Sequence, residues 1–223
     1  MIKRKSQSTK IERRMMETLN QSVKSNLKII LDLDSTIISS LRPFEKQPKN
    51  LKGYNMDGEF IVYERPGLQD FLDFLFQNFE VAVWTAASKD YALFIIEEIL
   101  LQKPDRKLSF VFHSYHGEIS EKISTCPKDL NLVWKIFPSF TPQNTIIIDD
   151  FEDVFVPQMC NSYPIPPFEA SSKNASNDRE LEKLKRKMES IHQGDCPNEG
   201  LLTETTLIKA IKKANLPLQK GSN

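Results

Sequence analysis

The sequence predicts an α/β fold, in which a mostly parallel sheet is flanked by helices and carries a small β-hairpin insertion. Two observations support this prediction. Short apolar runs of the kind found in buried parallel strands alternate with segments whose apolar residues recur at helical spacing. In addition, Asp57-Gly58 lies between two extended segments, and this pair signals a tight hairpin because such a turn needs positive φ.

The strands are predicted from short apolar runs, each followed by polar or turn-forming residues. The predicted strands are residues 27–31, 81–84, 110–112 and 145–148. Residues 53–63, on both sides of the Asp57-Gly58 turn, form the hairpin. Because helical segments separate the four strands, we expect the strands to pair in parallel within one sheet that is covered on both faces.

The helices are predicted from apolar side chains on one face and, for the last long helix, from a charged stretch. The predicted helices are residues 68–76, 89–102, 128–137 and 178–191, with a further short helix after Glu204. Residues 161–177 are rich in Pro and Ser, so we expect a surface loop there. The charged helix over 178–191 is interpreted as a solvated or dimer-forming element, and the sequence leaves both alternatives open.

The chain is expected to contain one folded domain between two tails. The domain covers residues 27–168, a basic tail covers 1–26 and a charged, partly helical tail covers 169–223. The basic tail is interpreted as a solvated segment that leads into a short helix. A nuclear-import or acidic-partner tract is the alternative, but basic clusters are weakly specific.

Composition excludes several classes of protein. Hydrophobic residues make up 39% and charged residues 27%, and 30 basic residues balance 30 acidic ones, so no net field attracts nucleic acid or a membrane. No apolar run approaches the roughly 20 residues of a membrane span. The three cysteines, Cys126, Cys160 and Cys196, are widely spaced, which indicates a reducing, intracellular compartment. A zinc site from His113, His116 and Cys126 lacks a fourth ligand, so ordinary surface residues are the preferred interpretation.

The first predicted strand ends in two aspartates, Asp32 and Asp34, followed by Ser35 and Thr36. Alternate residues of a strand point to the same side, so the two carboxylates can converge on one reacting group. Carboxylates that close repel each other unless a cation lies between them or one keeps a proton. Mg²⁺ would relieve this repulsion and would also attract a phosphate. The pair therefore suggests phosphoryl chemistry.

Other strand ends carry polar groups as well: Thr85 and Ser88 after the second strand, and Asp149-Asp150 after the fourth. Lys128 lies at the start of the intervening helix. The carboxyl ends of parallel strands gather ligands at one edge of the sheet. Each residue alone has a simpler interpretation, such as a helix cap or a surface lysine. Their order and common placement favour metal-assisted phosphoryl transfer.

These segments resemble the haloacid dehalogenase superfamily and, more narrowly, the phosphatases of the RNA polymerase II C-terminal domain, with their FCP1 homology domain. The segments that carry the resemblance are residues 31–37, 64–68, 84–92, 128–130, 146–150 and 154–155. The resemblance covers residues 27–168 as the catalytic domain and implies a Rossmann-like fold. It does not include either tail.

The resemblance implies a role for each matching residue. Asp32 is the nucleophile that forms an aspartyl-phosphate. Asp34 is the general acid for the leaving seryl or threonyl oxygen and then the base that activates water. Thr85 and Lys128 bind the phosphoryl oxygens. Because Asp34 must be protonated at the first step, activity should decline as the pH rises past its pKa.

The resemblance also implies a Mg²⁺ site. The ion would be held by Asp32, the backbone carbonyl of Asp34, and Asp150, with Asp149 orienting Lys128 or the metal waters. Two positions depart from the family. Ser35 replaces the usual acidic residue, at a non-catalytic position, and His113 stands where relatives often place an arginine near the substrate. Substrate recognition is therefore less well defined by the sequence than the chemistry.

The resemblance implies a phosphorylated protein or peptide as partner, such as the RNA polymerase II C-terminal domain, in the nucleus or cytoplasm. Direct binding of nucleic acid or a membrane is not expected, and the oligomeric state is not predicted. One alternative is a small-metabolite phosphatase of the same superfamily, but the insertion over residues 36–80 is too short for an enclosing cap. The other is a non-catalytic phosphopeptide-binding module, which would be expected to lose catalytic carboxylates.

Overall fold

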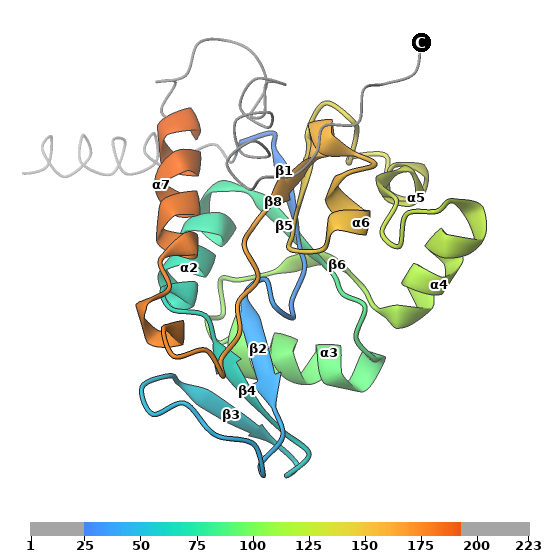
Figure 1. The fold of residues 1–223 in the computed structure, drawn as a ribbon. Coiled ribbons are helices and arrows are strands. Elements are labelled where there is room, and N and C mark those ends of the chain that lie inside the picture. The colour runs from blue at the N-terminus through green and yellow to red at the C-terminus, as the bar shows by residue number, and fades with distance from the viewer. Residues whose placement is uncertain (1–24, 193–223) are drawn as a thin grey trace, which may run out of the picture.

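The computed structural model describes residues 25–192 and contains a five-stranded sheet with helices on both faces (Figure 1). The order of the strands across this sheet is β6-β5-β1-β7-β8, and all neighbouring pairs are parallel. The strands are β1 (Lys28–Leu31), β5 (Glu80–Trp84), β6 (Leu108–Phe112), β7 (Thr145–Asp149) and β8 (Ser162–Pro164). The predicted α/β fold class and the four predicted strands are confirmed.

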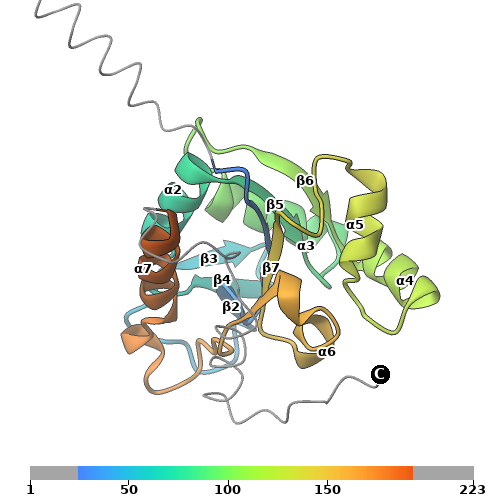
Figure 2. The same cartoon turned by 90° about the horizontal axis from the view of Figure 1, so that it is seen from above.

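The helices lie in two layers. One layer contains α2 (Leu68–Asn78), α3 (Lys89–Ile95), the π-helix η1 (Ile96–Leu100) and α7 (Glu180–His192). Those that line the opposite face are α4 (Ser114–Ile123), α5 (Leu130–Ile136) and α6 (Glu152–Phe155). Viewed from above, α2 and α7 lie on one side and α4 and α5 on the other (Figure 2). Short 3₁₀ turns are η2 (Met159–Asn161) and η3 (Ala175–Asn177).

The alternation of side chains in the central strands explains both layers. In β1, Ile29 and Leu31 belong to the core under α2 and α7, whereas Ile30 belongs to the core under α5. In β7, Ile147 faces the α5 side in the same way. All of these side chains are fully or almost fully buried, because both faces of a parallel sheet are covered by helices. The same alternation decides where the next polar residue of each strand points.

A second, antiparallel sheet lies beside the carboxyl edge of the first (Figure 1). Its strands are β2 (Ile38–Leu41), β3 (Gly53–Met56) and β4 (Phe60–Glu64), in the order β2-β4-β3. The hairpin prediction is confirmed, since Asp57 and Gly58 adopt φ of 48° and 76°. The insertion has three strands rather than two. The strand β2 escapes sequence analysis because Ser39 and Ser40 interrupt its apolar pattern.

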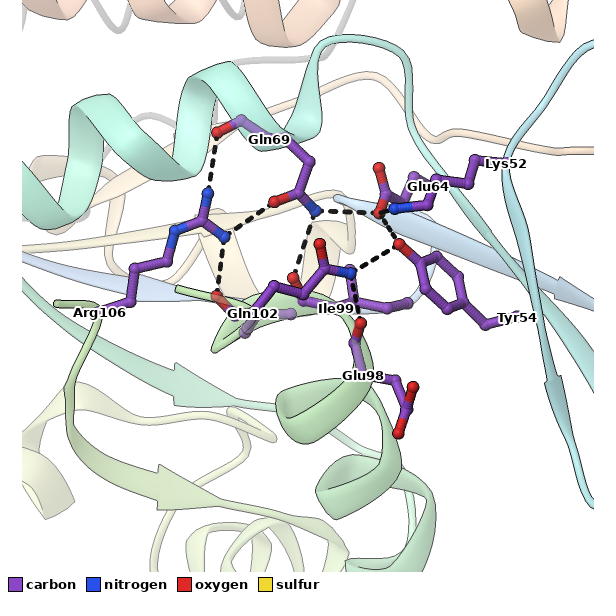
Figure 3. A network of polar contacts seen from close by, with 9 residues as sticks. Lys52, Tyr54, Glu64, Gln69, Glu98, Ile99, Gln102 and Arg106 are labelled. Carbon is purple, nitrogen blue, oxygen red and sulfur yellow. Dashed lines mark hydrogen bonds and ion pairs between the residues drawn. The ribbon is translucent and has the colours of Figure 1, made fainter. Parts of the chain in front are cut away.

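A polar network joins this small sheet to the main domain (Figure 3). Glu64 accepts hydrogen bonds from the Tyr54 hydroxyl group and from Gln69 Nε2, the latter over 2.9 Å. Gln69 Nε2 also donates to the carbonyl oxygen of Ile99 over 3.2 Å, and Gln69 Oε1 accepts from Arg106 Nη1 over 2.8 Å. Backbone hydrogen bonds in a π-helix join residues that are five positions apart, so the carbonyl groups at its C-terminal end have no partner within the helix and can accept from side chains. The small sheet is therefore fixed to α2 and to the end of the π-helix.

The C-terminal part of the described chain differs from expectation. The segment predicted as a loop over 161–177 contains β8, whose three residues, one of them Pro164, give too little pattern to detect. The predicted charged helix is α7, and one face of it is buried in the core through Leu181, Leu184 and Met188. It therefore packs within the molecule along that face. The helix α4 has no counterpart among the predicted helices, because its sequence is largely polar and few of its side chains are buried.

The predicted basic tail lies outside the described residues except at its end, as do Cys196 and the short helix expected after Glu204. In the described part, Cys126 and Cys160 are free thiols. Across residues 25–192, no helix combines the length and the apolar character that a membrane crossing requires.

Candidate active site

The site is built around Lys128, which bridges two aspartates from neighbouring strands. Its Nζ lies 2.5 Å from Asp32 Oδ1 and 2.7 Å from Asp149 Oδ2, and all three side chains are buried. In the register of β1 and β7, Leu31 pairs with Ile148, so the residues that follow, Asp32 and Asp149, lie side by side. Each continues the alternation that points toward the α5 face, where Lys128 approaches.

Burial and mutual charge shift the pKa values of this group. Burial alone would lower the pKa of Lys128, but the carboxylates of Asp32 and Asp149 outweigh it and raise that pKa. Burial, together with the charge of Asp32, raises the pKa of Asp149 to about 7 against the opposing effect of Lys128. Lys128 therefore stays charged at neutral pH and compensates two buried carboxylates. Its backbone is fixed as well, since Gln158 Nε2 donates to its carbonyl oxygen over 2.9 Å.

Asp32, Asp149 and Asp150 form a cluster that fits a divalent cation. One carboxylate oxygen from each lies within 4.8 Å of the others, and these three aspartates are the group capable of metal binding among the described residues. Hard cations such as Mg²⁺ take oxygen ligands of this kind. Thr36 Oγ1 donates to Asp150 Oδ1 over 3.1 Å and so orients the third carboxylate. Burial and the charge of Asp32 raise the pKa of Asp150.

Asp34 lies in a tight turn after β1, where the carbonyl oxygen of Leu33 accepts hydrogen bonds from the amides of Thr36 and Ile37. In this turn Ser35 has a φ of 58°, which is uncommon for a residue other than glycine. Asp34 Oδ1 accepts a hydrogen bond from the Tyr91 hydroxyl group over 2.6 Å. Burial raises the pKa of Asp34 to about 6, although the Tyr91 hydrogen bond acts in the opposite direction.

Thr85 follows β5 at the same edge of the sheet and is buried. Its Oγ1 accepts a hydrogen bond from the amide of Ala87 over 3.0 Å, and its own amide donates to the carbonyl of Phe112 over 2.9 Å. A hydroxyl group that accepts one hydrogen bond can still donate its proton. Three residues on, the Ser88 side chain caps the N-terminus of α3 by accepting from the amide of Tyr91.

The structure thus brings Asp32, Lys128 and Asp149 into direct contact and places Asp150 beside them. The carboxylate of Asp34 accepts a hydrogen bond from Tyr91. It lies close enough to the group for the charges of Asp32, Lys128 and Asp150 to shift its pKa. Thr85 makes local hydrogen bonds at the neighbouring strand end.

Two residues at this site, Tyr91 and Thr36, received no role from the sequence. A side chain in the first turn of a helix points back toward the start of that helix, so Tyr91 could be placed near the end of β5, but the sequence does not identify Asp34 as its partner.

His113 and His116 do not join this centre as a metal group. His113 is the N-terminal capping residue of α4, and its amide donates to His116 Nδ1 over 3.1 Å. The His116 ring stacks on Phe112 with ring centres 4.2 Å apart. The thiol of Cys126 instead lies 3.9 Å from the carbonyl oxygen of Val154. The preference for ordinary residues over a zinc site agrees with these contacts.

The chain is similar in sequence to several viral and cellular proteins. The CTD phosphatase-like protein 355R of Invertebrate iridescent virus 6 is 39% identical over 171 residues, which cover 70% of this chain and 94% of the viral protein. Its counterpart in Invertebrate iridescent virus 3 is 36% identical over 180 residues, or 73% of this chain and 95% of that protein. A ubiquitin-like domain-containing CTD phosphatase of Arabidopsis thaliana is 28% identical, and the match covers 70% of this chain but only 44% of the plant protein.

Among solved structures, the fission yeast RNA polymerase II CTD phosphatase Fcp1 bound to beryllium fluoride aligns with 96% of this chain and 62% of its own, at 21% identity and a TM-score of 0.48.

The aspartates and the lysine gather at the carboxyl edge of the parallel sheet. The chain belongs to the NLI interacting factor-like phosphatase family, whose family model matches residues 27–197, and the resemblance to phosphatases of this kind stated from the sequence is confirmed.

Proposed function

We propose that this protein is a Mg²⁺-dependent protein serine/threonine phosphatase that works through an aspartyl-phosphate intermediate. The observation that carries the proposal is the contact of Lys128 with both Asp32 and Asp149. Beside them lies a further aspartate, Asp34, whose raised pKa suits a proton donor. Hydrolysis of a phosphate monoester requires a nucleophile, positive charge near the phosphoryl oxygens and an acid for the leaving oxygen. Membership of a phosphatase family supports the same reaction class.

In the first step, a carboxylate oxygen of Asp32 attacks phosphorus while the bond between phosphorus and the seryl or threonyl oxygen breaks. Asp34 donates its proton to that oxygen, so the substrate leaves as an alcohol rather than as an alkoxide. Lys128 holds the phosphoryl oxygens through its charge, and Thr85 holds them through its hydroxyl proton. The phosphoryl group is then bonded to Asp32.

In the second step, Asp34 is a carboxylate and accepts a proton from a water molecule. The oxygen of that water attacks phosphorus, and the bond between phosphorus and the Asp32 oxygen breaks. Inorganic phosphate leaves, Asp32 is again a free carboxylate and Asp34 is again protonated. The hydrogen bond from Tyr91 supports the ionised form of Asp34 that this step needs.

The residues that would hold Mg²⁺ are Asp32, Asp150 and, through its backbone carbonyl, Asp34, while Asp149 would orient Lys128 or the waters around the ion. When bound, the ion supplies positive charge that offsets the repulsion between a carboxylate nucleophile and a phosphate dianion. The oxygen cluster of Asp32, Asp149 and Asp150 supports this part of the proposal.

The proposed substrate is a phosphorylated protein or peptide, of which the RNA polymerase II C-terminal domain is one candidate. The insertion before α2 is a three-stranded sheet that ends at Glu64, which is small for a cap that would enclose a metabolite. The names of the viral and plant relatives point to the same substrate class. A nuclear or cytoplasmic location suits such a substrate and the free thiols of Cys126 and Cys160.

Purified protein tests the proposal directly. With Mg²⁺ it should hydrolyse p-nitrophenyl phosphate and should prefer phosphoserine peptides to sugar phosphates in kcat/KM. Absence of turnover on every substrate, with any divalent cation, would refute the phosphatase assignment. A strong preference for sugar phosphates would instead identify a small-metabolite phosphatase and overturn only the substrate class.

A further inference from the structure

The segment after β8 runs across the loop that carries Asp34 and Thr36. The amide of Phe168 donates to the carbonyl oxygen of Ser35 over 2.6 Å, and the amide of Ala170 donates to Ser39 Oγ over 3.1 Å. Ser35 is the residue with positive φ in the catalytic turn. A chain segment more than 130 residues away in sequence therefore contacts that turn at its most constrained point.

One buried cation connects this segment to the turn. Arg65, whose side chain is 0% exposed, donates from Nη1 to the carbonyl oxygen of Thr36 over 2.8 Å. Its Nε and Nη2 donate to the two carboxylate oxygens of Asp178 over 2.8 and 2.9 Å. The ring of Phe168 lies 5.4 Å from the guanidinium carbon. Such a two-point pairing fixes the orientation of the guanidinium plane as well as its position.

The Asp178 carboxylate also connects to α7. Its Oδ1 accepts from the amide of Glu180 over 3.0 Å, at the start of the helix whose apolar face is buried against the core. Asp178 is therefore anchored by α7, Arg65 is anchored by Asp178, and the carbonyl oxygen of Thr36 is anchored by Arg65. While the carbonyl oxygen of Thr36 accepts from Arg65, the hydroxyl group of the same residue donates a hydrogen bond to Asp150 Oδ1. A shift of the guanidinium group would move the turn between the proton carrier and the acidic cluster.

We propose that Asp178 is a positioning residue for the phosphatase reaction, which acts through Arg65 on the turn that carries Asp34 and Thr36. The inference rests on the function proposed above. It assigns a catalytic consequence to the segment beyond residue 168. A buried side chain that fixes only the fold would change stability, whereas a residue that fixes the proton carrier changes the rate of the folded enzyme.

The chain offers a matched control. Arg106 is also buried, and its Nη2 donates to Asp73 Oδ1 over 2.7 Å. Its Nη1 contacts the carbonyl oxygen of Leu100 and Gln69, on the α2 and π-helix side of the molecule (Figure 3). Asp73 is more exposed than Asp178, with 41% against 17% of its side chain accessible. Both pairs join an arginine with little exposure to a carboxylate, but only the Arg65 pair contacts the catalytic turn in the described structure.

The test compares Asp178→Asn with Asp73→Asn in the full chain with Mg²⁺. Turnover is measured on a phosphoserine peptide and on p-nitrophenyl phosphate, well below the unfolding temperature of each variant and corrected for the folded fraction. The alcohol released from phosphoserine needs protonation, while nitrophenolate leaves readily without it. We expect Asp178→Asn to lower kcat on the peptide by about 10- to 100-fold with a smaller loss on the aryl ester, and Asp73→Asn to keep both values.

Equal kcat values for Asp178→Asn and the wild type, or equal fractional losses on both substrates, would overturn the positioning role while leaving the phosphatase assignment intact. An inactive wild type would overturn the proposed function and this inference with it. If Asp178→Asn does not fold, Asp178→Glu and Asp73→Glu replace the pair of variants. Both keep the negative charge and displace the carboxylate by one methylene group, and the same substrate-dependent loss is expected for Asp178→Glu alone. Wild-type kcat in Asp178→Glu would refute the role.

Discussion

The hydroxyl group of Tyr91 donates a hydrogen bond to Asp34 Oδ1 over 2.6 Å, and the same aspartate has a pKa raised to about 6. Burial stabilises the protonated form of Asp34, which the first step of the proposed reaction uses. Tyr91 stabilises the ionised form, which the second step uses. The environment therefore keeps both forms accessible near neutral pH.

The first prediction concerns pH. Because Asp34 must carry a proton to act as the acid, the protonated fraction falls about tenfold for each pH unit above its pKa. Turnover of a phosphoserine peptide should decline above about pH 6, where the pKa of Asp34 lies. Initial rates measured from pH 5 to pH 9 test this, with p-nitrophenyl phosphate as the less sensitive substrate. A peptide rate that rises steadily with pH would contradict the assignment of Asp34 as the acid.

The second prediction concerns Tyr91→Phe. Loss of a hydrogen bond that lowers the pKa of Asp34 should move the falling limb of the pH profile to higher pH. A shift of about one pH unit is expected, since a hydrogen bond to a charged group is worth roughly 1.5 kcal/mol or more. Tyr115→Phe, at an exposed tyrosine, is the control and should leave the profile unchanged. If the pH profile of Tyr91→Phe matches that of the wild type, the Tyr91 hydrogen bond does not control the pKa of the catalytic acid proposed here, Asp34.

The third prediction concerns the nucleophile. Asp32→Asn keeps the shape of the side chain but removes the charge that attacks phosphorus, so kcat should fall by at least about 10³-fold on every substrate. Circular dichroism of the variant should match the wild type, because Lys128 keeps its contact with Asp149. Substantial turnover by a folded Asp32→Asn variant would exclude the aspartyl-phosphate route.

The fourth prediction concerns stability. Lys128→Met leaves Asp32 and Asp149 buried without their cation, which should lower the free energy of unfolding by about 3–5 kcal/mol at neutral pH. Burial already raises the folded-state pKa of Asp149 above the unfolded value, and without the opposing charge of Lys128 it rises further. The folded state then binds more protons than the unfolded state, so the variant loses stability as the pH increases from acid toward neutral.

Urea unfolding of Lys128→Met at pH 5 and pH 8 measures this effect, with Lys135→Met as the control at an exposed lysine of α5. The loss relative to wild type should be larger at pH 8. A loss that does not depend on pH would mean that packing of the lysine stem, rather than its charge, dominates.

The fifth prediction concerns the cation. Mg²⁺ should raise the unfolding temperature, because an ion at 100 times its Kd stabilises the folded state by about 2.7 kcal/mol. Asp150→Asn should weaken this gain, whereas Asp153→Asn, at an exposed position in α6, should retain it. EDTA should abolish turnover without unfolding the protein. Equal Mg²⁺ responses in the two variants would remove Asp150 from the ligand set.

Much of the site was accessible to sequence analysis because it lies at strand ends. Once Leu31 and Ile148 end neighbouring parallel strands, the position of Asp32 beside Asp149 follows from register and alternation alone. The hairpin at Asp57 was predictable for a similar reason, since its turn needs a backbone conformation that few residue types tolerate.

Contacts that depend on tertiary packing were not accessible. The strand β8 has only three residues, one of which is a proline, so pairing with the neighbouring strand β7 rather than local propensity defines it. The pairing of Arg65 with Asp178 joins residues 113 positions apart, and neither carries a pattern that identifies the other. Tyr91 lies within a segment that resembles the family, yet its hydrogen bond to Asp34 becomes visible only when α3 is placed beside the turn.

The order of the strands has a consequence for how the protein folds. Of the described strands, β1 comes first in the sequence and lies at the centre of the sheet. One of its two neighbours is β7, so Lys28 can pair with Thr145 only after more than a hundred further residues have been made. Contacts this distant in sequence slow folding, and they form after local helices. During synthesis β1 has an open edge until the chain reaches β7. Recovery of turnover after dilution from denaturant should therefore follow recovery of helical signal, which makes the activity a reporter of the completed sheet.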